Sequence, residues 1–166
     1  PSNVQVGLRN FTVNKVMNQA FMDTPGLTEV TIPNTVTEIQ DQAFWNCKDL
    51  ETVNLPESLE KIDQWAFQYC TGLKDIILPS SLTTIENGAF FGSGLTGIHI
   101  PASVTSIGQG VLADCDALEY ITVDENNPVY DSRKQKLWGE GFSSNAIIET
   151  ASNTLIAGCK NTLIPY

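Results

Sequence analysis

Apolar residues recur along this chain about every 23 positions. The dipeptide Ala-Phe occupies residues 20–21, 43–44, 66–67 and 89–90, and Val111-Leu112 takes the next place after 22 residues. A second ladder has the form Leu-x-x-(Ile/Val)-x-(Ile/Leu/Val), at Leu27/Val30/Ile32, Leu50/Val53/Leu55, Leu73/Ile76/Leu78, Leu95/Ile98/Ile100 and Leu118/Ile121/Val123. One unit of this length cannot bury its own apolar face, so the repeat predicts coils that stack around a shared core.

Each triplet of the second ladder predicts a short strand. Val30 and Ile32 alternate with Glu29 and Thr31, the period of two that is typical of a strand with one buried face. Proline follows the first four triplets and ends the strand, because it has no N–H to donate. Stacked about 4.8 Å apart, the five strands would form a parallel sheet along one side.

The remainder of each unit supplies a second apolar segment and a turn. A third ladder pairs Val13/Val16, Val36/Ile39, Leu59/Ile62, Leu82/Ile85 and Val104/Ile107. The stretch around each Ala-Phe is long enough for only about one turn of helix. We therefore expect an α/β repeat protein with short helical turns opposite the sheet. The expected units of this single domain (residues 1–166) are 10–32, 33–55, 56–78, 79–100 and 101–123, with an irregular unit at 124–166.

The repeat also resembles a known family. Residues 50–70 read Leu-x-x-Val-x-Leu-Pro-x-Ser-Leu-x-x-Ile-x-x-x-Ala-Phe-x-x-Cys, which is similar to the BspA-like class of leucine-rich repeats, as are residues 123–130, 145–150 and 153–165. The resemblance implies a right-handed leucine-rich-repeat solenoid from a bacterial surface or secreted protein, in a class associated with adhesion. Residues 134–144 depart from the family pattern.

The two ends of the chain carry further expectations. Val6 and Leu8 are spaced for one more strand ahead of the first unit. Residues 146–150 and 154–157 flank Ala-Ser-Asn and predict a small hairpin. Residues 163–165 resemble the opening of another coil, which indicates a longer array. Residues 1–10 lack the basic start and apolar stretch of a signal peptide.

Composition narrows the classes of partner. The 166 residues include 9 Lys and Arg against 19 Asp and Glu, a formal charge of −10, which disfavours a nucleic-acid partner because phosphates would be repelled. No apolar run approaches the roughly 18 residues of a membrane span, so we expect no membrane insertion by this segment.

Motifs for catalysis, metals or cofactors are weak. Cys47, Cys70 and Cys115 share one place in their coils, which indicates buried free thiols, since parallel side chains keep Cβ atoms about 5 Å apart. One histidine and no Cys-x-x-Cys disfavour zinc. Residues 92–97 match G-x-G-x-x-G but precede a strand, where a dinucleotide motif does not occur. We expect no cofactor, no metal and no enzymatic activity.

Residues 124–128 are the remaining candidate for an ion site, a calcium-binding loop. They begin like such a loop, but Val129 and Gln135 occupy the places of the required Gly and Glu. A polar turn that leaves the last regular strand is the favoured interpretation.

Two surfaces are candidate ligand sites. The outer strand face carries two variable columns, which suit protein binding or are merely solvated: Glu29, Thr52, Asp75, Gly97 and Tyr120, and Thr31, Asn54, Ile77, His99 and Thr122. His99 should therefore be exposed. Aromatic residues flank the Ala-Phe place in units two to four, where they either bind a ligand or cover the core: Trp45, Trp65, Tyr69 and Phe91.

These features favour a non-catalytic binding or adhesion module outside a bacterial cell, which recognises a protein or glycan on another cell or matrix. The alternative is a structural spacer in a larger surface protein, with no ligand of its own.

Overall fold

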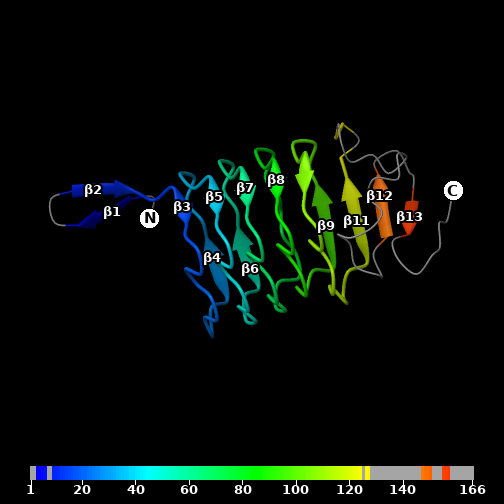
Figure 1. The fold of residues 1–166 in the computed structure, drawn as a ribbon, viewed down its shortest axis with the longest axis horizontal. Coiled ribbons are helices and arrows are strands. Elements are labelled where there is room, and N and C mark those ends of the chain that lie inside the picture. The colour runs from blue at the N-terminus through cyan, green and yellow to red at the C-terminus, as the bar shows by residue number, and fades with distance from the viewer. Residues whose placement is uncertain (1–2, 7–8, 125, 128–146, 151–154, 158–166) are drawn as a thin grey trace.

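Each repeat folds into one coil, and successive coils stack along a single axis (Figure 1). The computed structural model describes the chain except for residues 1–2, 7–8, 125, 128–146, 151–154 and 158–166. Two rows of short strands run along the stack. The described residues contain no helix, and hence none of the length and apolarity that a membrane span requires.

The third ladder of the sequence forms a continuous parallel sheet. Its strands are β3 (Lys15–Val16), β5 (Glu38–Ile39), β7 (Lys61–Ile62), β8 (Thr84–Ile85) and β10 (Ser106–Ile107), in that spatial order. The register is that of the repeat, because Val16 pairs with Ile39, Ile39 with Ile62, Ile62 with Ile85 and Ile85 with Ile107.

The triplet ladder forms a second row, but not the single five-stranded sheet that the pattern predicts. Strand β4 (Glu29–Thr31) pairs in parallel with β6 (Thr52–Asn54), and β9 (Gly97–Ile100) pairs in parallel with β11 (Tyr120–Val123). Residues 75–77 lie between these two groups and adopt no strand pairing. The sheet is therefore interrupted at the third coil.

The predicted helical turns are wrong, and the hydrogen bonds show why. In the second coil the N–H groups of Gln42, Phe44 and Asn46 donate to carbonyls of the next coil at 2.8–3.0 Å. Gln42 and Asn46 have φ of 54° and 58°, values that end any helix after one turn. Alternate residues close local turns instead, as Ala43 N–H does on Gln40 O at 3.1 Å. This segment is therefore a stack of turns bonded from coil to coil.

A column of phenylalanine rings runs through the core. Phe21 and Phe44, and then Phe44 and Phe67, stack with centroids 5.1 Å apart, and Phe67 and Phe90 stack at 5.5 Å. The planes of successive rings differ by 5° or less. Phe44, Phe67 and Phe90 are fully buried. The like-over-like stacking that the repeat predicts is confirmed.

Hairpins lie at both ends of the stack. The predicted strand at Val6 exists as β1 (Asn3–Val6), but it pairs antiparallel with β2 (Arg9–Thr12) instead of joining the coils in parallel. At the other end, β12 (Ile147–Thr150) pairs antiparallel with β13 (Leu155–Ala157), as predicted, and in parallel with β11. Leu8, Cys159 and the expectations on residues 134–144 and 163–165 lie outside the described residues.

Candidate functional site

The stacked turns contain two positions per coil with left-handed backbone. The first position is Gln19, Gln42, Trp65, Gly88 and Gly110 in the five coils, and the second is Asp23, Asn46, Tyr69, Gly92 and Asp114. Glycine, asparagine and aspartate tolerate such φ values, whereas a bulky residue there costs on the order of 1–3 kcal/mol. Trp65 (φ 53°) and Tyr69 (φ 59°) are therefore unusual occupants, and both lie in the third coil.

Glycines of the fourth coil make room for these two rings. A Cβ atom at Gly88 would lie 2.5 Å from Cδ1 of Trp65, and one at Gly92 would lie 2.6 Å from Cδ1 of Tyr69. Each ring thus rests directly on the backbone of the next coil. Even so, Trp65 and Tyr69 each keep 39% of their surface exposed.

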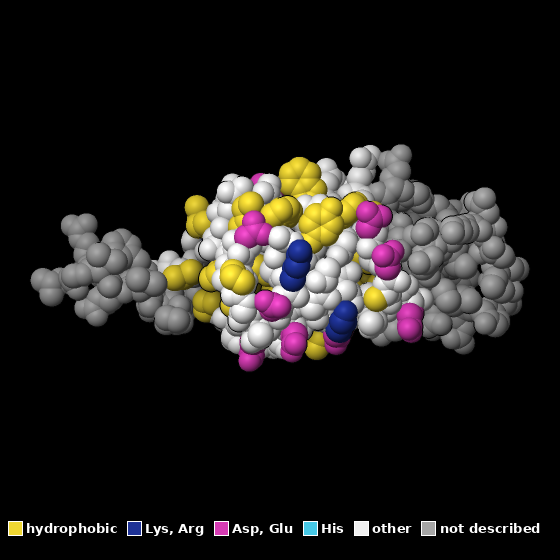
Figure 2. Space-filling model, turned by 90° about the horizontal axis from the view of Figure 1, so that it is seen from below, with side chains coloured by type: hydrophobic (Ala, Val, Ile, Leu, Met, Phe, Trp, Pro, Cys, Tyr) yellow, Lys and Arg dark blue, Asp and Glu magenta, His cyan; other side chains and the backbone are white. Residues whose placement is uncertain are grey.

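The four predicted aromatic residues form one group, here called the aromatic cluster. Tyr69 contacts Trp45 edge-on at 6.2 Å and Phe91 edge-on at 5.7 Å between ring centroids. Trp65 joins through a hollow of about 500 Å³ that it lines together with Phe91, Asn87 and Gln109. On the face seen in Figure 2, hydrophobic side chains gather among acidic ones, so apolar surface is open to solvent there.

Polar groups accompany the cluster. The indole N–H of Trp45 donates to Oε1 of Gln68 at 2.7 Å, and Oδ1 of Asn87 accepts from the backbone N–H of Gln109 at 2.7 Å. Trp45 and Phe91 are half-buried, so they also cover the flank of the core. Exposed rings beside fixed amides can stack on a planar or sugar-like surface and orient it by hydrogen bonds.

The strand-face columns are brought together only in two separate parts. Nδ2 of Asn54 donates to Oγ1 of Thr31 at 3.2 Å and to Oε1 of Glu29 at 3.4 Å. Nδ1 of His99 lies 2.9 Å from Oγ1 of Thr122. His99 is exposed, as predicted.

Between these two parts, the columns are not continuous. The backbone of Thr52 pairs with that of Glu29, and the backbone of Gly97 pairs with that of Tyr120, whose side chain lies outside the described residues. Asp75 and Ile77 have no strand partner, because they fall in the interruption.

The three cysteines that the structure describes pack in the core. Cys47, Cys70 and Cys115 are buried free thiols, as predicted. Each donates to the carbonyl of a phenylalanine in the preceding coil, at 2.9–3.1 Å. Burial raises the pKa of all three thiols, so they stay protonated at neutral pH and lack the thiolate that nucleophilic or metal chemistry requires.

The end of the fifth coil is a polar turn. Oδ1 of Asp124 accepts the N–H of Asn126 at 2.9 Å, an arrangement typical of an Asx turn. Buried Asn127 donates from Nδ2 to the carbonyls of Pro101 and Val104 at 2.9 and 2.8 Å. Asn127 thus fixes the preceding proline turn, a role that the sequence pattern missed. Within the described ranges, no three His, Cys, Asp or Glu residues lie close enough to hold a metal ion.

Sequence reasoning also missed a line of ion pairs along the continuous sheet. Lys15 pairs with Glu38, and Lys61 pairs with Asp63 at 2.6 Å and with Glu86 at 3.5 Å. The bond from Lys15 lowers the pKa of Glu38. Lys15, Glu38 and Lys61 are spaced by 23 residues, a pattern that could have found the pair Lys15–Glu38, whereas Asp63 lies in the same coil as Lys61.

Comparisons with known proteins agree with this architecture. The family model for the BspA type leucine rich repeat region matches residues 8–132 in six copies. Comparison with curated proteins gave no match.

Three solved structures illustrate the similarity. A leucine-rich repeat protein from Bacteroides ovatus is 31% identical over 78% of this chain and 39% of its own, with a TM-score of 0.71. The leucine-rich repeat protein of T. pallidum is 33% identical over 74% of this chain and 56% of its own, with a TM-score of 0.68. The pneumococcal vaccine antigen PcpA is 28% identical over 76% of this chain and 40% of its own, with a TM-score of 0.60. The matches thus span less than two thirds of these longer chains.

Proposed function

Because this chain belongs to the family of BspA-type leucine-rich repeat proteins, we propose that it is a non-catalytic binding module of a bacterial surface or secreted protein. The vaccine-antigen relative PcpA supports a location outside the cell. The ligand would be a protein or a glycan presented by another cell or a matrix.

The observation that carries this proposal is the placement of Trp65 and Tyr69. Their left-handed backbone is unfavourable for aromatic residues, and each side chain still leaves 39% of its surface exposed. The other coils place smaller or more polar residues at the same positions without loss of the stack. Strain of this kind is typical of sites where a side chain is needed for a contact outside the fold.

A spacer without a ligand is the second candidate. It is supported by the continuous sheet β3-β5-β7-β8-β10 and by the phenylalanine column, which together make a long, uniform rod suited to separate other domains. The spacer requires no exposed aromatic residues, so the aromatic cluster favours the binding module.

The test combines a glycan array with a pull-down against purified extracellular matrix and host-surface proteins. The variant Trp65→Gln/Tyr69→Asn takes the residues that Gln42 and Asn46 supply at the same two positions, so the coil should fold normally. We expect binding to weaken about tenfold or more, as the loss of aromatic anchors does in protein interfaces. The control Gln42→Gly copies Gly88 at the same position and should bind as wild type does.

Two other outcomes would contradict the aromatic site, and a third would contradict the binding role itself. Equal binding by the aromatic variant would remove the aromatic cluster from the site. Loss of binding on His99→Ala, with the aromatic variant unaffected, would move the site to the strand face. Absence of any ligand in both screens would favour the spacer.

A further inference from the structure

The hollow beside Trp65, here called the Trp65 hollow, brings an exposed aromatic ring and two amide residues together. Trp65 of the third coil lines it with Asn87 of the fourth coil and Gln109 of the fifth. Its volume of about 500 Å³ lies within the roughly 300–1,000 Å³ that is typical of small-molecule sites. Among the described residues that line it, none is charged. The hollow therefore suits a small neutral group with both an apolar surface and hydrogen-bonding atoms.

Glycines replace larger residues next to the ring. Gly88 and Gly110 occupy the left-handed position that glutamine holds in the first two coils. Trp65 rests on Gly88, where a Cβ atom would lie 2.5 Å from Cδ1 of the indole. No side chain of the fourth coil therefore stands at this position to cover the ring, and Trp65 keeps 39% of its surface exposed.

A third glycine makes room for the amide of Asn87. A Cβ atom at Gly108 would lie 2.4 Å from Oδ1 of Asn87. The other four coils place larger residues there: Met17, Gln40, Asp63 and Glu86. Oδ1 of Asn87 accepts the backbone N–H of Gln109 at 2.7 Å, and Nδ2 has no hydrogen-bond partner among the described residues. The amide is thus held by its oxygen and keeps its donor for a ligand.

The backbone beside the ring is already engaged. The N–H of Trp65 donates to the carbonyl of Asn87 at 3.1 Å, and the N–H of Gly88 donates to the carbonyl of Gln109 at 2.8 Å. A peptide that entered the hollow would bury N–H and C=O groups that require partners. The hydroxyls of a sugar lie at its rim, where they can bond to an amide side chain and to water. These features favour a sugar over a peptide segment.

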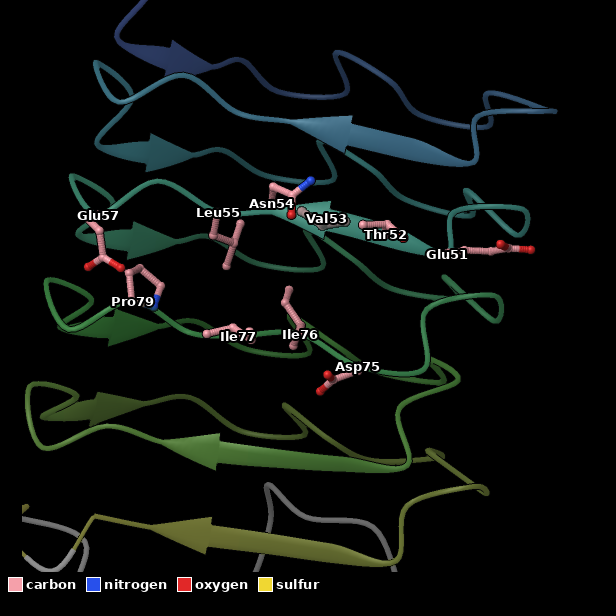
Figure 3. Close-up of a pocket in the computed structure, with 10 residues that line it drawn as sticks. All are labelled: Glu51, Thr52, Val53, Asn54, Leu55, Glu57, Asp75, Ile76, Ile77 and Pro79. Carbon is pink, nitrogen blue, oxygen red and sulfur yellow. The ribbon is translucent and has the colours of Figure 1, made fainter.

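A second hollow, over the interruption at the third coil, has the opposite character (Figure 3). Glu57 lies at one end of it, and Glu51 and Asp75 lie towards the other. Its apolar lining is aliphatic, with no aromatic ring among the described residues that form it. A flat ring beside an uncharged amide is therefore a feature of the Trp65 hollow and not of this acidic one.

We propose that the Trp65 hollow binds one neutral hexopyranose unit of a glycan, with the sugar ring stacked on the indole and a hydroxyl bonded to Asn87. The C–H bonds on one side of a pyranose form an apolar, slightly positive face, which packs on the negative face of an aromatic ring. The hydroxyls at the edge of the sugar then reach the amide beside the indole. The inference rests on the proposed binding role and narrows the ligand from a protein or glycan to a glycan.

The probes are the methyl β-glycosides of glucose, galactose and mannose, with binding followed by saturation-transfer NMR on the full chain. At least one of the three should receive saturation. The ring protons on one face of that sugar should receive more than those on the other, because one face contacts the indole. Methyl β-glucuronide, which adds a carboxylate to the glucoside, should bind more weakly to a chain with a formal charge of −10.

Two aromatic variants locate the site. Trp65→Gln copies Gln42 at the same position of the second coil, so the coil should fold, and saturation of the sugar should be lost. The control Trp45→Phe copies Phe91 at the same position of the fourth coil and changes a ring that does not line the hollow. It should bind the sugar as wild type does.

The variant Asn87→Asp tests the hydrogen bond separately from the stacking. It copies Asp41 at the same position of the second coil and keeps an oxygen for the N–H of Gln109, but it loses the amide donors. The affinity for the sugar, from titration of the saturation signal, should fall about threefold or more. The preference for one face of the sugar should remain, because the indole is unchanged.

The sugar assignment and the proposed binding role fail separately. Equal saturation with wild type and Trp65→Gln, equal saturation of both sugar faces, or loss of the signal in Trp45→Phe as well would overturn the stacked site. A chain that binds none of the three glycosides, but captures a protein through Trp65 in the pull-down, would overturn the sugar assignment alone. Absence of both kinds of binding would overturn both proposals.

Discussion

One position in each coil shows how strictly the stacking of the coils limits the type of residue that fits there. Thr24, Cys47, Cys70, Ser93 and Cys115 occupy it in the five coils. All are small residues with a weak or moderate hydrogen-bond donor, and Thr24 and the three cysteines donate to a phenylalanine carbonyl. The position therefore requires a small donor that fits beside the phenylalanine column, and a thiol fills it without exposing a polar group.

The thiol of Cys70 makes stability depend on pH. Burial raises its pKa in the folded protein above the ordinary value of 9.0. Below about pH 8 the thiol is protonated in both the folded and the unfolded protein, so its contribution to the free energy of unfolding is fully present. Above about pH 9 only the unfolded chain releases the proton, so the free energy of unfolding falls, by at most about 1.4 kcal/mol per pH unit from this group. We expect Cys70→Ser, which keeps the donor as Ser93 does, to show a shallower decline.

The measurement is urea unfolding of both proteins at intervals from pH 6 to pH 10. The two curves of stability against pH should run parallel up to about pH 8 and separate above about pH 9. Identical slopes at high pH would show that the Cys70 thiol is not protected from ionisation in the fold.

The contacts of residues that recur in every coil were predictable from the sequence, whereas the contacts of residues that occur in one coil only were not. The phenylalanine column and the buried thiols follow from spacing alone, because a residue in one coil must lie over its equivalent in the next. Asn127 lies 23 residues after Val104, where the ladder has an apolar residue, so nothing in the repeat indicated its bonds to Pro101 and Val104. The aromatic cluster was predicted as a group, but its left-handed backbone was not, since Trp65 and Tyr69 carry no signal for it.

The turns and strands show where a local pattern is insufficient. Asp23, Asn46, Gly92 and Asp114 are residues that favour left-handed turns, and that signal could have excluded the helical turns. The interruption at the third coil could not have been predicted, because Ile76 and Leu78 continue the apolar ladder that forms strands in the other coils. The one irregularity is Ile77, an apolar residue at a position that is polar in the other coils. Strand pairing depends on how neighbouring coils meet, and the fourth coil is one residue shorter just before β9.

Two glycines provide a matched test of how a turn supports the aromatic cluster. Gly92 and Gly26 both have left-handed backbone, at φ of 63° and 74°. A Cβ at Gly26 meets nothing within 4 Å, whereas one at Gly92 meets the ring of Tyr69 at 2.6 Å. Gly26→Ala should cost only the backbone strain, roughly 1–2 kcal/mol. Gly92→Ala should cost more and displace Tyr69.

Tyrosine and tryptophan fluorescence, with urea unfolding, measures both effects. Gly26→Ala should leave the native emission spectrum unchanged, because its added Cβ would meet no atom within 4 Å and so displaces no ring. Gly92→Ala should change the spectrum and weaken any binding that depends on the aromatic cluster. The same spectrum and the same loss of stability in both variants would mean that Tyr69 does not rest on Gly92.

Across the whole molecule, stability comes from repeated contacts between neighbouring coils. Each coil bonds to the next through the turn stack and the continuous sheet, and each phenylalanine contacts only its immediate neighbours in the column. Such a rod has a free energy of unfolding that is close to a sum over coils and their interfaces. The fold and the aromatic cluster are then separable, because the scaffold repeats while Trp65 and Tyr69 occur in the third coil alone.

Removal of one complete coil tests this separation. Deletion of residues 56–78 joins Leu55 to Pro79, which restores the Leu-Pro step of the other coils and places Phe44 against Phe90. We expect a folded, less stable protein, shorter along its axis by about one strand spacing of 4.8 Å. It lacks Trp65 and Tyr69, so binding that depends on these two residues should be lost while the rod persists.

Deletion of residues 56–66 is the control, since it removes half a coil and puts apolar positions out of register with their neighbours. Circular dichroism and urea unfolding should show a cooperative transition for the full-coil deletion. Its free energy of unfolding should change less steeply with urea concentration than that of the wild type, because less surface is exposed on unfolding. The half-coil deletion should be unfolded. An unfolded full-coil deletion would show that the third coil stabilises the rod through more than contacts with its neighbours. Retained binding in that deletion would place the ligand site on the coils that remain.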